Sequence, residues 1–442
     1  MKFQTFSYHT LDEIRQAANG LSLTLPLSEV LRVLRQPVSA GPLRLANRIA
    51  IQPMEGCDGT PDGRPDTLTQ RRYRRFARGG AGLIWFEATA IVQEGRANPR
   101  QLYLNKKTLD SFRTQVEEIK EEGMRQNGFA PVVICQLTHS GRYAKPEGVP
   151  APLIAYNNPL FEKEQPIDKS RIVSDDKLKR LEEAFGATAL LAQEAGFDGA
   201  DIKCCHRYLL SEMLSAFTRP GDYGGAFENR TRLLRNATFL PAKGATSGEF
   251  LITSRVNLYD GFAYPYGFGV SPTGGLMPDL TEPKALVTLL HEELRLPMLD
   301  FTIGNPYVNP HVNRPYDGGP YVPDEHPLEG VARMLGCIGQ LQKAFPSLCV
   351  IGSGFSYLRQ FSPYLAAGAV EQSVCDLAGF GRMAFAYPDF PRDTLYGEGF
   401  NARKTCIACG KCSALMRAGT VAGCVVRDGE TYLPFYQAHC CV

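Results

Sequence analysis

Short apolar runs alternate with longer stretches of mixed polarity along most of this chain. The apolar runs are bounded by Gly, Pro, Asp and Asn, a pattern typical of strands that are buried on both faces. The first predicted strand ends at Met54, and the others cover 82–86, 131–136, 199–202, 250–256, 298–303, 348–351 and 373–380. The intervening helices are predicted from Thr67 and over 109–123, 175–196, 228–239, 282–293, 328–344 and 362–367.

Eight strands alternating with helices predict a parallel α/β fold. Eight such units in roughly 340 residues fit a TIM (β/α)8 barrel with insertions. An open doubly wound sheet is the alternative, but no G-x-G-x-x-G follows the first strand. We expect three segments: an N-terminal extension over 1–40, the barrel over 41–398 and a small cysteine-rich segment over 399–442.

Composition narrows the class of protein. The formal net charge of the 442-residue chain is +2, so no bulk electric field would attract nucleic acid or an anionic membrane. No apolar run has the length of a membrane span, and the first residues lack the apolar core of a secretory signal. We therefore expect a cytoplasmic protein with neither a nucleic-acid nor a membrane partner. Five arginines in the helix from Thr67 indicate a solvated helix face.

Reactive side chains gather directly after the strand over 199–202. Lys203, His206 and Tyr208 supply a cation, an imidazole and a phenol within six positions. Polar groups at the carboxyl end of a barrel strand usually belong to an active site, so these three are the candidate catalytic residues. A polar loop with a structural tyrosine is the alternative interpretation.

The carboxyl ends of other strands offer groups suited to a flavin. Gln136 can pair with a pyrimidine edge, and Arg255 can stabilise negative charge on a reduced ring. Glycine-rich turns after the seventh and eighth strands form the usual phosphate corner of this barrel. The full set of candidate cofactor-binding residues is Pro53, Met54, Glu55, Ala88, Gln136, Arg255, Gly352, Ser353, Gly354, Gly381 and Arg382.

Four of the thirteen cysteines form one tight run near the C-terminus. Cys406, Cys409, Cys412 and Cys424 have the spacing C-x2-C-x2-C-x11-C, which suits one iron–sulfur cluster or one zinc ion. We interpret Cys57, Cys135, Cys337, Cys349 and Cys375 as small buried hydrophobic residues, whereas Cys440 and Cys441 have no assigned role.

The central motif resembles that of the Old Yellow Enzyme family of FMN-dependent ene-reductases. The residues that match its hallmark are His206, Tyr208, Arg219, Asp222, Tyr223, Gly224, Gly225, Asn229 and Arg230. The resemblance covers about 41–395 and implies that the candidate cofactor-binding residues hold FMN. Two positions depart from the family: Lys203 replaces a His, and Glu55 stands where relatives often carry Thr or Cys. A carboxylate there would disfavour an anionic reduced flavin.

The cysteine run, CIACGKC, resembles the [4Fe–4S] motif that follows the same barrel in trimethylamine dehydrogenase and 2,4-dienoyl-CoA reductase. This resemblance favours a [4Fe–4S] cluster over zinc. Those relatives continue into FAD- and pyridine-nucleotide-binding domains, and we expect these to be lacking here. Either NADH or NADPH then reduces FMN directly, or an electron-donor protein acts through the cluster.

The resemblance implies a reductase for an activated C=C bond in an α,β-unsaturated substrate of the enoate or enone type. Lys203 and His206 would hold the carbonyl or carboxylate, reduced FMN would give a hydride to the β-carbon, and Tyr208 would protonate the α-carbon. Lys203 in place of His favours a fully anionic group. Tyr307 and His311, in the loop after the sixth strand, are further candidates for lining the pocket, and a loop fixed by its prolines is the alternative.

Two other functions stay open at this point. An amine dehydrogenase would share His206 and Tyr208, but Lys203, Glu55 and Asn305 depart from the trimethylamine dehydrogenase pattern. A flavin and cluster electron-transfer subunit would need no Tyr208. The substrate itself, the electron donor, the direction of the reaction in the cell and any homo-oligomer are not given by the sequence.

Overall fold

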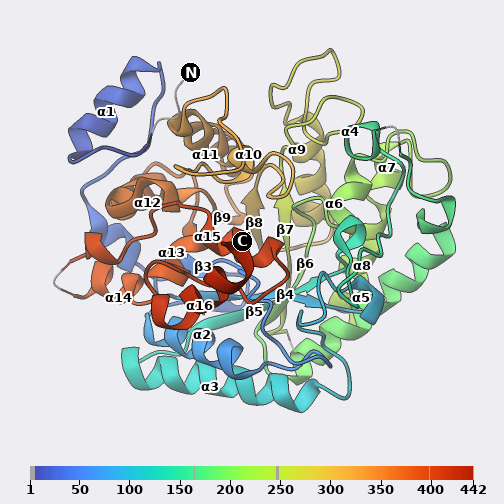
Figure 1. Ribbon diagram of the computed structural model, residues 1–442, viewed down its shortest axis with the longest axis horizontal. Helices are drawn as coiled ribbons and strands as arrows, with labels where there is room; N and C mark the ends of the chain where they lie inside the picture. The colour runs from blue at the N-terminus through green and yellow to red at the C-terminus, as the bar shows by residue number, and fades with distance from the viewer. Residues whose placement is uncertain (1–4, 164, 245–247, 398, 442) are drawn as a thin grey trace.

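The computed structural model describes residues 5–163, 165–244, 248–397 and 399–441. Its centre is a closed barrel of parallel strands in the order β10-β3-β4-β5-β6-β7-β8-β9 (Figure 1). Every residue in these strands is buried, as expected for strands between a packed interior and a layer of helices. The strands are β3 (Ile49–Ile51), β4 (Leu83–Ala90), β5 (Val132–Thr138), β6 (Gly199–Ile202), β7 (Leu251–Asn257), β8 (Met298–Thr302), β9 (Cys349–Gly352) and β10 (Leu377–Phe380). The prediction of a TIM barrel is confirmed.

Helices surround the strands. The main ones are α2 (Thr67–Arg78), α3 (Leu109–Asn127), α5 (Asp175–Glu194), α8 (Arg232–Gly244), α9 (Thr281–Val287), α11 (Pro327–Ala344) and α12 (Ser362–Glu371). Local sequence sets where several of them begin. The Asp66 carboxylate accepts a hydrogen bond from the Thr67 amide, and the Ser174 hydroxyl accepts one from Lys177 at the start of α5.

Shorter helices complete the chain. They are α1 (Leu11–Gly20), α4 (Pro159–Glu162), α6 (Leu209–Leu214), α7 (Phe227–Arg230), α10 (Pro310–Asn313), α13 (Arg382–Ala386), α14 (Phe390–Leu395), α15 (Lys411–Arg417) and α16 (Gly429–Cys440). Within the described ranges, no helix is both long enough and apolar enough to cross a membrane.

The last predicted strand was too long at its start. The residues from 373 to 376 form a turn after α12, where Ser373 has a positive φ of 55°, and β10 begins only at Leu377. The apolar residues Val374 and Cys375 made this turn look like strand. The single helix predicted over 228–239 is also wrong in part, because it is divided into α7 and α8.

An unpredicted hairpin of β1 (Val38–Ala40) and β2 (Leu43–Leu45) closes the amino-terminal end of the barrel. Its buried residues Ala40 and Leu45 belong to one apolar cluster with inward-facing strand residues, including Trp85. The hairpin crosses the predicted boundary between residues 40 and 41. This apolar plug leaves the opposite, carboxyl-terminal end of the barrel to carry the polar groups.

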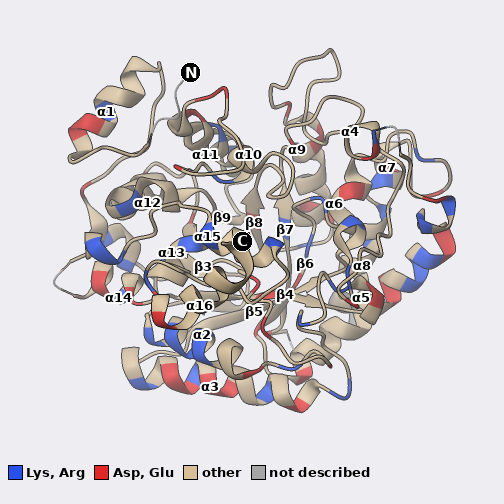
Figure 2. Cartoon of the chain, viewed as in Figure 1, with Lys and Arg blue, Asp and Glu red and all other residues tan. Residues whose placement is uncertain are grey.

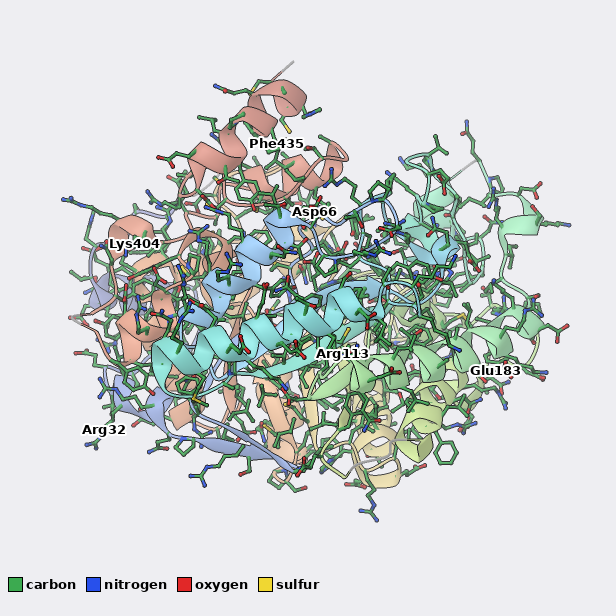
Figure 3. All side chains as sticks on the ribbon, turned by 90° about the horizontal axis from the view of Figure 1, so that it is seen from below. Arg32, Asp66, Arg113, Glu183, Lys404 and Phe435 are labelled. Carbon is green, nitrogen blue, oxygen red and sulfur yellow. The ribbon has the colours of Figure 1, made fainter. Side chains whose placement is uncertain are left out.

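The C-terminal helices lie at that opposite end, in front of the strands in Figure 1. Figure 3, a view from below, shows Phe435 of α16 projecting past Asp66 at the start of α2, while Arg32 lies near the other end of the molecule. Tyr432 and its apolar neighbours form a small core of their own, against which Cys440 packs. This packing gives Cys440 a structural role.

Arginines of α2 contact the C-terminal segment and the barrel, and the prediction of a solvated helix face is wrong for Arg72, which is buried. Arg71 and Arg75 both pair with Asp428, which directly precedes α16, and Figure 2 shows α2 beside that helix. Arg72 is buried between the carboxylates of Asp58 and Glu87. Helical spacing alone could not reveal these partners, because they come from three distant loops and strands.

Candidate active site

An open cavity lies at the carboxyl ends of the barrel strands, with about 1050 Å³ of empty space including its mouth. Twelve predicted site residues line it: Pro53, Met54, Glu55, Gln136, Lys203, His206, Tyr208, Arg255, Ser353, Gly354, Gly381 and Arg382. Ala88 and Gly352 are not among the lining residues. The Ala88 carbonyl accepts a hydrogen bond from Gln101, and a side chain on Gly352 would collide with Cys375.

The floor of the cavity is organised by Asp201, which sequence reasoning missed. Its carboxylate accepts hydrogen bonds from Gln136 Nε2 at 2.6 Å, from Trp85 Nε1 at 2.8 Å and from the Arg255 amide at 2.7 Å. These contacts fix the orientation of the Gln136 amide before any ligand binds. Burial raises the pKa of Asp201 to about 6, although its three donors oppose the shift.

A second buried acid, Asp300, lies beside the first and was also missed. It accepts a hydrogen bond from Gln52 at 3.0 Å, and Arg255 Nε lies 3.0 Å from its Oδ2. Ser353 donates to the Phe301 carbonyl at 2.8 Å and accepts from Gln52. Burial raises the pKa of Asp300 to about 7, with Arg255 opposing this rise. A lone acid inside an apolar strand was the signal that could have found both aspartates.

Two arginines meet at the other side of the cavity. Arg314 donates a hydrogen bond to Ser413, and Arg382 donates to the Pro315 carbonyl at 3.1 Å. Neither guanidinium has a carboxylate within 4.0 Å among the described residues. Burial and the neighbouring Arg382 lower the pKa of Arg314 to about 10. A side chain on Gly381 would collide with Met54, so a glycine fits beside the two arginines at this corner.

Two of the candidate catalytic residues, Lys203 and Tyr208, form one connected group with Glu55 and Tyr307. The Tyr208 hydroxyl donates to Glu55 Oε1 at 3.0 Å and lies 2.8 Å from the Tyr307 hydroxyl. Lys203 Nζ lies 3.5 Å from the same Glu55 oxygen and 3.6 Å from the centre of the Tyr208 ring. Burial, with Glu55 and Tyr307 adding to it, raises the pKa of Tyr208 well above its usual value. The phenol is therefore held in its protonated form.

His206 differs from this group because its buried Nε2 has no hydrogen-bond partner in the described part of the chain. Its backbone has a positive φ of 62°, which directs the loop after β6. Burial, followed by the charges of Arg255 and Lys203, lowers the pKa of His206 well below its usual value. A neutral imidazole that faces the cavity unpaired is suited to a ligand.

The loop after β8 (Met298–Thr302) contains two candidate lining residues, and one of them lines the cavity. Tyr307 lines the cavity and stacks on Tyr143, with ring centres 4.0 Å apart. His311 does not line it, because its Nδ1 lies 2.5 Å from the hydroxyl of Tyr321 outside the cavity. Asn305 donates to the Tyr143 hydroxyl at 2.9 Å, which fixes the start of this loop.

The four clustered cysteines line a second, smaller cavity. Cys406 Sγ accepts a hydrogen bond from the Ala408 amide at 3.4 Å, and Cys424 Sγ accepts one from the Arg427 amide at 3.3 Å. Ala408 has a positive φ of 53°, which turns this loop around the cavity. Burial raises the pKa of Cys406 to about 11, although Arg382 opposes the shift.

The two cavities share a wall made of Cys412, Arg382 and Phe385. Within the described residues, no three His, Cys, Asp or Glu side chains are close enough to hold a single metal ion. The remaining predicted buried cysteines, Cys57, Cys135, Cys337, Cys349 and Cys375, are all buried, as are Cys204 and Cys205.

Comparison with known proteins gives a family match. The model of the NADH:flavin oxidoreductase / NADH oxidase family matches residues 33–264, just over half of the chain. NADPH dehydrogenase from Bacillus subtilis is 33% identical over 212 residues, which cover 46% of this chain and 58% of that protein. NADPH dehydrogenase from Clostridium acetobutylicum is 31% identical over 231 residues, covering 52% and 64%. The chain thus matches somewhat more than half the length of these relatives.

Solved structures show the same fold. A 2-naphthoyl-CoA reductase complex has a TM-score of 0.73 at 19% identity and covers 90% of this chain and 57% of its own. Histamine dehydrogenase from Rhizobium sp. 4-9 has a TM-score of 0.68 at 21% identity, covering 89% and 52%. An Old Yellow Enzyme homologue from Zymomonas mobilis has a TM-score of 0.61 at 22% identity, covering 83% and 94%.

Proposed function

Since the chain belongs to the NADH:flavin oxidoreductase / NADH oxidase family, we propose that it is an FMN-dependent reductase of C=C bonds conjugated to a carbonyl group. The observation that carries this proposal is the single cavity in which Tyr208, the unpaired His206 Nε2 and a cradle suited to a flavin meet. The relatives are NADPH dehydrogenases, so NADPH or NADH is the proposed reductant.

The residues of the cavity fit FMN. Arg314, Arg382 and Gly381 would hold its phosphate, because the arginines have no carboxylate partner in the described residues. Gln136 and Arg255, whose positions are fixed by Asp201, would bind the polar edge of the ring. When bound, FMN supplies two-electron chemistry by accepting a hydride from the reductant and giving it to the substrate.

The chain itself binds the substrate and moves the proton. His206 and Lys203 would donate hydrogen bonds to the carbonyl oxygen and stabilise the negative charge that develops there. Tyr208 would release its hydroxyl proton to the α-carbon, while the β-carbon receives the hydride, so the C=C bond gains two electrons and two hydrogens. Lys203, 3.6 Å from the centre of the Tyr208 ring, would stabilise the phenolate that remains.

We further propose that Cys406, Cys409, Cys412 and Cys424 hold a [4Fe–4S] cluster. In such a cluster each thiolate binds a different iron, whereas four ligands of one zinc ion converge within about 2.3 Å of a single point. This part of the proposal rests on the spacing C-x2-C-x2-C-x11-C and on the one cavity that all four cysteines line. The shared wall at Cys412 supports electron transfer between the two cofactors, so an electron-donor protein is the second proposed source of electrons.

The test is Tyr208→Phe studied in two separate anaerobic half-reactions. We expect reduction of FMN by NADPH to be unchanged and oxidation of the reduced protein by an enone to slow by about 10²–10⁴-fold. Tyr223→Phe is the matched control, because that hydroxyl is buried against Glu182 outside the cavity. Equal oxidation rates in Tyr208→Phe and wild type would overturn the role of Tyr208.

An amine dehydrogenase receives less support. Asn305 commits its side-chain amide to Tyr143, and the cation Lys203 lies directly beside Tyr208. Adding amines to the same substrate screen tests this alternative. An electron-transfer subunit would reduce neither enones nor enoates.

A further inference from the structure

Lys203 has an internal counter-ion. Its ammonium and the Glu55 carboxylate lie 3.5 Å apart, and their side chains are only 4% and 11% exposed. A cation so far removed from water requires a nearby negative charge, and Glu55 is the carboxylate that supplies it. The expectation that Lys203 selects a fully anionic substrate assumed an unpaired cation, and this contact removes that premise.

Four ionisable side chains near this pair, those of Tyr208, Tyr307, Cys57 and His206, are neutral. The pKa values of Tyr208 and Tyr307 are raised well above their usual range, mainly by burial. Burial also raises the pKa of the Cys57 thiol, and that of His206 is lowered. The charges of Lys203 and Glu55 therefore offset each other where the substrate carbonyl would bind, and Arg255 and Arg314 are further cations of the same cavity.

We propose that Glu55 determines substrate class, and that it makes the site select uncharged carbonyl compounds (ketones, esters or thioesters) over free carboxylates. This inference rests on the proposed function. It assigns to Glu55 a specificity role in addition to its contact with Tyr208.

The physical reason is repulsion between like charges. A substrate carboxylate bound by Lys203 would lie beside Glu55, and two carboxylates in a cavity of low dielectric cannot both stay ionised without a large cost. An uncharged carbonyl oxygen can accept hydrogen bonds from Lys203 and His206 while Glu55 stays paired with Lys203. Selection thus comes from a repulsive element built into the site.

The test compares kcat/KM for crotonate and methyl crotonate in the FMN-loaded protein. Wild type should prefer the ester, and Glu55→Gln should raise the ratio of acid to ester by about tenfold or more. Because Glu55 also accepts a hydrogen bond from Tyr208, both rates can fall in this variant, but that effect cancels in the ratio. Tyr307→Phe is the control: it removes the other partner of Tyr208, keeps the Glu55–Lys203 pair and should leave the ratio unchanged.

An equilibrium readout separates this inference from the proposed function. Calorimetric titration of the oxidised, FMN-loaded protein measures its affinities for benzoate and benzamide. The ratio of the benzoate affinity to the benzamide affinity should be higher in Glu55→Gln than in wild type. If neither crotonate compound is reduced, the proposed function fails, and the binding ratio still tests Glu55. A wild type that prefers crotonate, or a Glu55→Gln variant with both ratios unchanged, would overturn the inference.

Discussion

The two cavities that meet at Cys412 are built in opposite ways. Around the barrel cavity, Asp201 and Asp300 orient Gln136, Arg255 and Gln52 through buried hydrogen bonds before any ligand is present. The cysteine cavity is lined mainly by two short C-terminal stretches, 405–412 and 424–427, with Arg382 and Phe385 of α13. Buried hydrogen bonds between side chains thus shape the first site, whereas the second would depend on the proposed cluster to complete it. This contrast suggests that the two sites can be lost separately.

The largest expected effect is the loss of bound iron from the cysteine cavity without loss of FMN from the barrel cavity. Cys409→Ser should lose nearly all bound iron, because a cluster requires all four thiolates, while FMN content stays near one per chain. Iron and flavin analysis of anaerobically purified protein measures both quantities. Cys441→Ser is the matched control, since that exposed cysteine belongs to the same segment and lies outside the cavity. Full iron content in Cys409→Ser would remove the cluster proposal.

On the barrel side, the buried arginine of α2 carries the largest expected effect on stability. Arg72→Met leaves Asp58 and Glu87 without a counter-charge, so the free energy of unfolding should fall by about 3–5 kcal/mol. Arg74→Met, at an exposed position of the same helix, should change it by about 0.5 kcal/mol or less. Urea denaturation measures both. If the two substitutions lowered the free energy of unfolding equally, the ion pairs of Arg72 with Asp58 and Glu87 would not be what stabilises this part of the barrel.

The free energy of unfolding should depend on pH in opposite directions at the barrel floor and at the C-terminal segment. The pKa of Asp300 is about 7 in the folded protein and about 3.9 in an unfolded chain. Between these values the folded state holds a proton that the unfolded state has released, so this group makes stability fall as pH rises. Asp300→Asn should flatten that fall by up to about 4 kcal/mol between pH 4 and pH 7. Thermal unfolding of both proteins across this window is the measurement, and parallel curves would contradict the assignment.

The smallest expected effect concerns the attachment of the C-terminal segment. Burial opposes ionisation of Asp428, but Arg71 and Arg75 outweigh it and lower its pKa. Its stabilising contribution is therefore present above about pH 4 and is lost as pH falls through the folded pKa. Asp428→Asn should destabilise the segment by about 1 kcal/mol at neutral pH and speed its proteolysis, with FMN content unchanged. Glu430→Gln, an exposed change two residues away, should leave the proteolysis rate as it is in wild type.

Sequence patterns predicted what is local. The strand over 199–202 has the predicted bounds, and the apolar runs located all eight strands of the barrel. The candidate site followed from these strands, because the carboxyl ends of parallel strands meet at one end of a barrel. The strand predicted from Ser373 was too long, since a turn with apolar side chains has the same composition as a buried strand.

Sequence could not predict which distant charges meet. Glu55 and Lys203 are 148 positions apart, and Arg71 and Asp428 are 357 apart. Both pairs form only after the barrel closes and the C-terminal segment folds onto α2. For this reason Lys203 was interpreted as an unpaired cation, and the arginines of α2 as a solvated face. Asp201 and Asp300 were missed because the single acid in each otherwise apolar strand was given no role.

The most direct test of the account is the cofactor content of the protein after anaerobic purification. The visible spectrum, the released flavin, the iron and the acid-labile sulfide should be measured on one sample. We predict one FMN, about four irons and about four sulfides per chain, with flavin bands above a broad cluster absorption. A colourless protein that contains one zinc ion and no flavin would contradict both the proposed reductase and the connection between the two cavities.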